Sequence, residues 1–207
     1  MSNKDYEKLI DIIQYNTNLL RVFDALTKLN ITDYYIGAGV ISQTVWNHIT
    51  KKEITFGISD IDIVIFDSDN LDKEFEVKLR NKLLSILGDF PFWLDIKNQA
   101  GVHLWYKDKF GYDIEPYTSL ESAINTWPTT ASSIGIRKCK TKWKIYAPFG
   151  IEDLMNLRVV ANSRQINEEI YLKKQKKWQS KWIELVFEEW DDKIIPIKNC
   201  KVIEINR

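Results

Sequence analysis

The spacing of hydrophobic residues changes several times along the chain, and these changes predict alternating helices and strands. Where apolar side chains recur three or four residues apart, the spacing is typical of a helix with one buried face. Short apolar runs bounded by turn residues predict strands instead. We expect helices over residues 5–16, 17–29, 40–48, 71–87, 120–127, 151–158 and 168–182, and strands over 34–36, 58–66, 92–96, 134–137 and 143–146.

This order of elements predicts a protein of the α+β class, with a mixed central sheet flanked by helices and a helical C-terminal part. The last two of those strands are expected to pair, and weak alternation from residue 193 onward predicts a further edge strand. A length of 207 residues suits one domain or one domain with a small appendage. We therefore expect a domain over residues 1–160 and an extension over 161–207 packed on it, or one single domain.

Two aspartates lie inside the predicted strand 58–66, although aspartate is disfavoured in strands. Asp60 and Asp62 are two residues apart, so on a strand their carboxylates point to the same face. Neighbouring carboxylates raise at least one pKa unless a cation lies between them. Mg²⁺ binds such carboxylates together with substrate phosphates. The pair therefore indicates phosphoryl or nucleotidyl transfer, with two ions about 3.5–4 Å apart, unless both side chains simply face solvent.

A third aspartate, Asp95, lies in the apolar segment Phe92–Ile96. Burying a lone carboxylate is costly unless it is paired or binds a metal. If this strand lies beside the strand 58–66, Asp95 joins Asp60 and Asp62 as a metal ligand. It could then also act as the base that removes a proton from the hydroxyl that accepts the transferred group. The alternative is that Asp95 pairs with the nearby Lys97.

The triplet Asp67-Ser68-Asp69 has the same spacing as the first pair but precedes the predicted helix 71–87. Asp69 or Asn70 as N-cap accounts for this triplet through helix capping and the helix dipole. We therefore interpret the second triplet as structural.

Glycines mark the corner between the predicted strand 34–36 and the helix 40–48. Gly37 and Gly39 allow backbone N–H groups to approach a phosphate, and the helix N-terminus adds partial positive charge. Ser42 and Gln43 on the first helical turn are candidate hydrogen-bond donors. The pattern alone is not specific, because many such corners contain two glycines, and it is not a Walker A loop.

Charge and composition narrow the class of partner. The chain has 29 basic and 29 acidic residues, and this balance argues against a broad grip on a long nucleic acid. The charged N-terminus is unlike a secretory signal, no run is long enough to span a membrane, and Cys139 and Cys200 lack metal-site spacing. We expect a cytoplasmic protein without membrane contact. The eight Trp, nine Tyr and nine Phe residues favour an aromatic core over base-stacking platforms.

Taken together, the motifs resemble a family of small bacterial proteins identified as nucleotidyltransferases of the polymerase-β type, similar to the head domain of tRNA CCA-adding enzymes. The resemblance covers roughly residues 30 to 185. It rests on Tyr35–Gly39 with Gln43–Asn47, Ser59–Asp62 with Phe66-Asp67, Asp95–Ala100, His103–Trp105, Thr126–Ala131 and Ala147–Gly150.

The resemblance implies that residues 1–160 form a nucleotidyltransferase head domain of polymerase-β fold. It implies that Asp60, Asp62 and Asp95 bind Mg²⁺ (or Mn²⁺) and that Gly37 and Gly39 contact the phosphates of an NTP. The acceptor, whether a small molecule, RNA or protein, is left open. CCA-adding enzymes carry an Arg-Asp pair where this chain has Ser42-Gln43, which puts CCA addition itself in doubt.

Two other functions remain as alternatives to an active transferase. The Ser42-Gln43 departure is compatible with a catalytically inactive nucleotide-binding module of the same fold. A small RNA-binding protein would instead use the lysines of the predicted helix 168–182, together with its Trp178 and Trp182. The ordinary interpretation of that helix is an apolar seam of tryptophans against the core, with the lysines on a solvated face.

Overall fold

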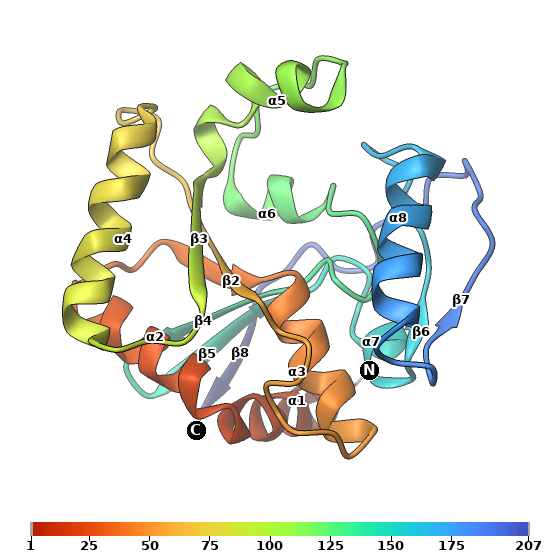
Figure 1. The fold of residues 1–207 in the computed structure, drawn as a ribbon, viewed down its shortest axis with the longest axis horizontal. Coiled ribbons are helices and arrows are strands. Elements are labelled where there is room, and N and C mark those ends of the chain that lie inside the picture. Colours follow the sequence, from red (N-terminus) through yellow and green to blue (C-terminus); the bar gives the residue numbers. More distant parts are fainter. Residues whose placement is uncertain (1, 207) are drawn as a thin grey trace.

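Residues 2–206 are described in a computed structural model, drawn in Figure 1. The helices are α1 (Asn3–Tyr15), α2 (Thr17–Lys28), α3 (Gly39–Ile49), α4 (Lys73–Leu87), α5 (His103–Phe110), α6 (Leu120–Ile124), α7 (Glu152–Met155) and α8 (Glu168–Gln179), with a 3₁₀ turn, η1 (Gln99–Gly101), before α5. The strands are β1 (Tyr34–Gly37), β2 (Asp60–Ile65), β3 (Trp93–Asn98), β4 (Gly135–Cys139), β5 (Lys142–Tyr146), β6 (Arg158–Val159), β7 (Val186–Phe187) and β8 (Ile203–Asn206).

Six strands form one mixed sheet in the order β3-β2-β1-β4-β5-β8. β2 and β3 are parallel, whereas all other neighbours in this sheet are antiparallel. The predicted pairing of residues 134–137 with 143–146 is confirmed by β4 and β5, and the predicted edge strand in the tail is confirmed by β8. The α+β class with a mixed sheet flanked by helices is confirmed as well. β6 and β7 form a separate two-stranded parallel sheet.

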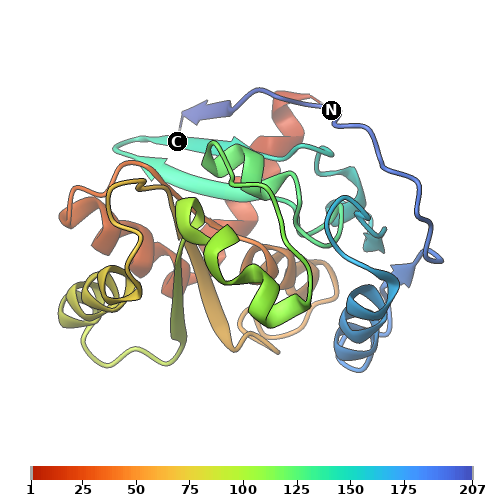
Figure 2. The same ribbon diagram turned by 90° about the horizontal axis from the view of Figure 1, so that it is seen from above.

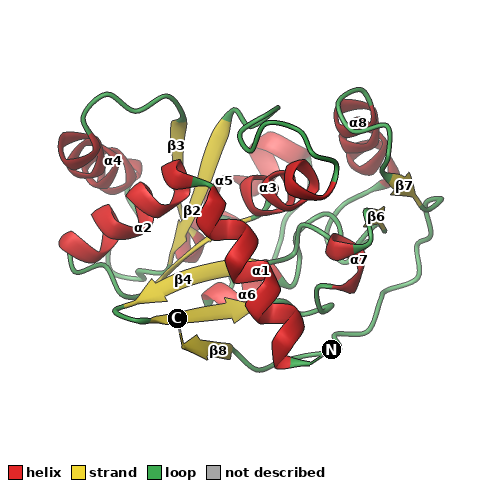
Figure 3. Ribbon diagram, turned by 90° about the horizontal axis from the view of Figure 1, so that it is seen from below, coloured by secondary structure: helices red, strands yellow, loops and turns green. Residues whose placement is uncertain are grey.

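One face of the large sheet is covered by helices and forms the main core. Ile61, Ile63 and Ile65 of β2 point to this face because side chains alternate along a strand, and all three are buried. The apolar stripes of α1, α2, α3 and α4 contribute to the same cluster. Figure 3 shows α1, α2 and α3 lying across this side of the sheet.

The opposite face is only partly covered. Tyr35 and Val64 point to it and pack with Leu120 and Ile124 of α6 in a second, smaller apolar cluster. Figure 2 shows α5 and α6 on this side of the sheet. Because α6 is short, part of the face stays uncovered, and this part carries the polar residues of β2 and β3.

The C-terminal part of the chain packs on α3 through tryptophans. The Trp178 ring packs edge to face on Trp46, with ring centroids 5.1 Å apart, and the Trp182 ring lies 5.6 Å from Trp46. The Trp182 indole donates a 2.8 Å hydrogen bond to Asn47 Oδ1. The interpretation of this segment as an aromatic seam is confirmed. Between α8 and β8, the described chain contains the short strand β7 and no helix, so the predicted helical character ends with α8. The division at residue 160 stays a prediction.

The prediction for the start of the fourth helix was wrong. The helix predicted from residue 71 begins at Lys73, and its N-cap is Asp72, whose carboxylate accepts from the Glu74 N–H. Asp69 and Asn70 do not cap it, because their N–H groups donate to the Asp67 carboxylate in a loop that delays the helix. Helix α5 was not predicted at all. None of the helices within residues 2–206 is long and apolar enough to cross a lipid bilayer.

Candidate functional site

The parallel pairing of β2 with β3 brings the three predicted aspartates to the uncovered face. Asp62 is the direct register partner of Asp95, and Asp60 lies one step earlier on the same face of β2. On the other side of β2, Asp62 is the register partner of Gly37 at the end of β1. The sheet therefore places the carboxylates beside the glycine corner.

Two of these carboxylates lack a cationic partner within residues 2–206. Asp60 accepts a hydrogen bond from the hydroxyl of Ser59, and neither Asp60 nor Asp62 forms an ion pair there. Burial, together with the charges of Asp60 and Asp95, raises the pKa of Asp62 to about 7. Such a pair has uncompensated negative charge, which a bound cation would neutralise.

The third carboxylate is engaged elsewhere. Asp95 Oδ1 lies 3.1 Å from Lys97 Nζ, and the same ammonium lies 3.6 Å from Glu76 Oε2. The ion pair with Lys97 is thus present, as the alternative interpretation of Asp95 required. Asp95 remains close enough to Asp62 to affect its pKa.

The carboxylates of the site can be compared with what a divalent cation needs. Within the described residues, no group of three or more His, Cys, Asp or Glu side chains is arranged to hold a metal ion. The unpaired carboxylates of Asp60 and Asp62 still fit Mg²⁺, which keeps several waters and takes one or two protein carboxylates plus phosphates. Binding of the metal by all three aspartates stays a prediction.

The glycine corner forms one side of the site. A Cβ on Gly37 would lie 2.5 Å from the Ile134 carbonyl oxygen and 2.7 Å from the Trp127 ring, so glycine is required there by close packing. Between the glycines, Ala38 has a positive φ of 54° and is the N-cap of α3. Its N–H donates to the Ile134 carbonyl, which ties the corner to β4.

The two polar residues predicted beside this corner differ in their surroundings. Ser42 is fully buried, and its hydroxyl donates a 2.9 Å hydrogen bond to the Ala38 carbonyl. Gln43 is only 7% exposed, lines a cavity with Gly39, and its amide has no hydrogen-bond partner within residues 2–206. The structure thus places Gly39 and Gln43 at the cavity, whereas Gly37 and Ser42 support the corner from behind.

A cavity of about 290 Å³ joins the carboxylates to the corner. Asp60 and Asp62 line it, but Asp95 does not. The opposite wall contains Lys174 and Lys177 of α8, which the sequence interpretation had placed on a solvated face. Burial lowers the pKa of Lys174, as does Lys177, while Asp62 and Asp60 raise it. The remaining lining residues are Ala38, Val40, Val64, Lys97, Gln99, Trp127, Pro128, Ser132 and Trp178.

These lysines are held over the cavity by the tryptophan seam. Lys174 precedes Trp178 by one helical turn, and its Nζ lies 5.0 Å from the centre of the Trp178 ring. Because Trp178 packs on Trp46, the lysine face of α8 is turned toward the sheet. Anionic groups between α8 and β2 would therefore meet two ammonium groups on one side and a helix N-terminus on the other.

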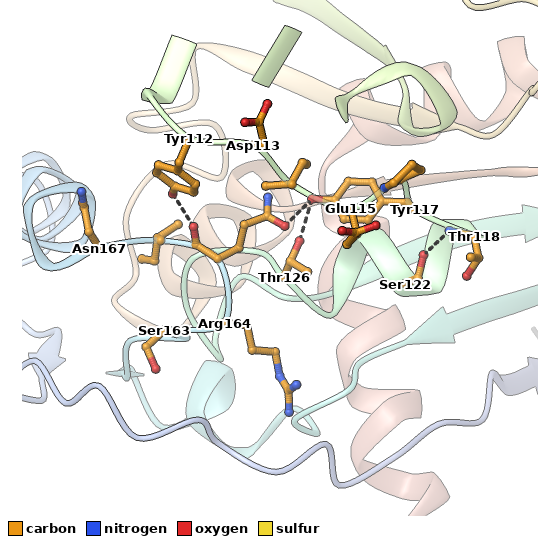
Figure 4. Close-up of a pocket in the computed structure, with 14 residues that line it drawn as sticks. Tyr112, Asp113, Glu115, Tyr117, Thr118, Ser122, Thr126, Ser163, Arg164 and Asn167 are labelled. Atoms are coloured by element: carbon orange, nitrogen blue, oxygen red, sulfur yellow. Dashed lines mark hydrogen bonds between the residues drawn. The ribbon is translucent and has the colours of Figure 1, made fainter. Parts of the chain in front are cut away.

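A larger cavity, of about 590 Å³, lies elsewhere and contains none of the predicted site residues (Figure 4). Its wall includes Tyr117, whose hydroxyl lies 2.9 Å from both Thr126 Oγ1 and Gln165 Oε1. We place the candidate site in the smaller cavity, because Asp60 and Asp62, two lysines of α8 and the N-terminus of α3 meet there.

The fold is similar to that of a protein of known structure. An NMR structure described as revealing a CCA-adding enzyme head domain is similar to this chain, with a TM-score of 0.71 and 25% sequence identity. The match covers 89% of this chain and 96% of that chain. This chain thus has the fold of a nucleotidyltransferase head domain.

A family model described as nucleotidyltransferase matches residues 24–187. Because this match covers most of the chain, the protein belongs to that nucleotidyltransferase family. Among curated proteins, none matches the sequence. Family and fold together support transfer of a nucleoside monophosphate in general, and the resemblance seen in the sequence is confirmed.

Proposed function

We propose that the protein transfers a nucleoside monophosphate from an NTP to a hydroxyl, phosphate or amine of an acceptor in a reaction that depends on Mg²⁺ or Mn²⁺. The observation that carries this proposal is the unpaired couple Asp60 and Asp62, which faces Lys174 across the cavity beside the N-terminus of α3. Negative charge for metal and positive charge for phosphate thus meet in one place.

In this proposal the phosphates of the NTP lie between the corner and α8. The Gly39 backbone and the Gln43 amide donate hydrogen bonds to phosphate oxygens, while Lys174 and Lys177 neutralise their charge. Asp60 and Asp62 hold Mg²⁺, with Asp95 completing the set when it leaves Lys97. When bound, the metal withdraws electron density from the α-phosphate and stabilises the charge that develops on the leaving oxygen.

The reaction then consists of one substitution at phosphorus. An acceptor oxygen or nitrogen forms a bond to the α-phosphorus, the bond to the bridging α–β oxygen breaks, and pyrophosphate leaves with that electron pair. The proton of the acceptor passes to a carboxylate, for which Asp95 is the proposed base. The Lys97 Nζ atom lies 3.1 Å from Asp95 Oδ1, so this lysine must move away before Asp95 can act as the base.

Calorimetric titration with NTP and Mg²⁺ tests the assignment. We expect Asp60→Asn and Asp62→Asn to weaken metal and nucleotide binding, because each removes a negative charge from the proposed metal site. Asp69→Asn is the matched control, since Asp69 belongs to the other triplet and its side chain lies outside the cavity. Equal binding by wild type and the two cavity variants would refute the proposed site.

One observation favours a second function, nucleotide binding without transfer. The ion pair between Asp95 and Lys97 withholds the proposed base, as expected for a module that has lost catalysis. Release of pyrophosphate from NTP across a panel of hydroxyl, phosphate and amine acceptors distinguishes the two functions. Binding with no release from any acceptor would favour the inactive module.

A further inference from the structure

The carboxylate cavity adjoins an aromatic groove of about 410 Å³. One wall of the groove comes from α5, including Trp105, Tyr106 and Phe110, and the other includes Trp127 and Ile170. The groove and the carboxylate cavity share five lining residues, which are Lys97, Gln99, Trp127, Pro128 and Lys174. A ligand whose phosphates lie beside Asp60 and Asp62 would therefore extend directly into the groove.

At the junction of the two cavities lies a polar side chain that can face a ligand, Gln99. Gln99 is 6% exposed, lines both cavities, and its amide makes no hydrogen bond to another residue between 2 and 206. The amide is thus available for a hydrogen bond to a ligand in either cavity. A glutamine amide has a donor and an acceptor side by side, which matches the paired donors and acceptors on the edge of a nucleobase.

We propose that this groove binds the nucleobase of the donor nucleotide, with the ring against the aromatic walls and its polar edge on the Gln99 amide. This inference rests on the proposed function, because the NTP is the molecule that joins a phosphate chain to a flat ring. Aromatic side chains stack on any base, so Trp105 supplies affinity and Gln99 supplies orientation.

The test compares the binding of MgATP, MgGTP, MgCTP and MgUTP with that of magnesium tripolyphosphate, which has phosphates but no base. Calorimetry should show that at least one NTP binds more tightly than tripolyphosphate to the wild type, by on the order of 10-fold. Gln99→Leu should weaken binding of that NTP by about 10-fold, which is a larger loss than for tripolyphosphate, because only the NTP has a base for the amide to bind.

Gln99→Leu should also keep the fold, since it replaces an amide that makes no hydrogen bond to another residue between 2 and 206 by an apolar group of similar size. On α5, Trp105→Ala should weaken NTP binding by on the order of 10-fold through lost stacking. Its matched control is Leu104→Ala, because Leu104 is the next residue on the same helix, is 60% exposed and does not line the groove. This control should bind NTP like the wild type.

The outcomes separate this inference from the proposed function. If the NTPs and tripolyphosphate bind equally well and neither variant changes this, the groove does not hold the base, while the phosphate and metal site stands. If the wild type binds neither ligand in the presence of Mg²⁺, the proposed function itself fails.

Discussion

The triplets Asp60-Ile61-Asp62 and Asp67-Ser68-Asp69 have the same spacing but different surroundings. On β2 the first pair points into a cavity without ion-pair partners in the described chain. In the following loop, the Asp67 carboxylate accepts from the N–H groups of Asp69 and Asn70, at 3.0 and 3.2 Å, and from the Asn70 amide at 2.9 Å. An extended backbone leaves carboxylates available to a ligand, whereas a turn directs them to the chain's own N–H groups.

The largest expected difference between the two triplets is in transferase activity. Asp62→Asn should lower the turnover of NTP by on the order of 100-fold or more, because a metal ligand acts on the charge of the transition state. Asp69→Asn should leave turnover unchanged. The measurement is pyrophosphate release under single-turnover conditions. An equal loss of activity in both variants would show that the spacing of the aspartates, and not their place in the cavity, determines activity.

In the first triplet, Asp62 should make the stability of the protein depend on pH. The pKa of Asp62 is raised to about 7, above its ordinary 3.8, so the folded state holds a proton that the unfolded chain releases. The free energy of unfolding therefore falls as pH rises through this window. With a chelator present to remove metal ions, Asp62→Asn should be more stable than the wild type above about pH 7. This difference in stability should disappear as the pH falls to the ordinary Asp pKa of 3.8.

Denaturant titrations across this pH range measure the effect, and Mg²⁺ provides its control. Because a cation compensates the carboxylates, added Mg²⁺ should stabilise the wild type and not Asp62→Asn. A pH-independent difference between the two proteins would contradict the raised pKa.

In the second triplet the same substitution should have the opposite effect on stability. Asp67→Asn weakens the hydrogen bonds to the Asp69 and Asn70 N–H groups, so it should lower the free energy of unfolding by about 1 kcal/mol. Urea unfolding at neutral pH is the measurement. A stabilised Asp67→Asn protein would show that this loop has no need of the carboxylate.

The smallest effect concerns the third aspartate. Replacing Lys97 by Met removes the ammonium from Asp95 and frees that carboxylate to join Asp60 and Asp62. Because a partly exposed ion pair contributes only about 0–1 kcal/mol, we expect Mn²⁺ affinity without nucleotide to rise a few-fold. Weaker Mn²⁺ binding by Lys97→Met would exclude Asp95 as a third ligand.

Much of the sheet could be predicted from local pattern. The alternation of Ile61, Ile63 and Ile65 defines β2 and places Asp60 and Asp62 on the other face without any tertiary information. Pairing with Asp95 required only that the next strand be its neighbour, and the register confirms that Asp62 and Asp95 lie side by side.

The other half of the site depends on contacts between distant residues. Lysines on α8 look solvated in sequence, and only the packing of Trp178 on Trp46 turns Lys174 toward Asp62. Helix α5 escaped prediction because its residues lack a clear apolar stripe, with Leu104 exposed and Tyr106 buried. The sequence places Ser42 in the first turn of α3, but it could not reveal that the Ser42 hydroxyl donates a hydrogen bond to the Ala38 carbonyl.

The backbone of Ala38 has a consequence for how a ligand would be received. A positive φ of 54° is unfavourable for alanine and is held here by the bonds of Ala38 to Ile134 and Ser42. The corner is therefore rigid before an anion binds, so binding does not incur the entropy cost of ordering a flexible loop. Ala38→Gly should lower this conformational penalty by about 1 kcal/mol. If the glycine makes the corner flexible instead, phosphate should bind more slowly.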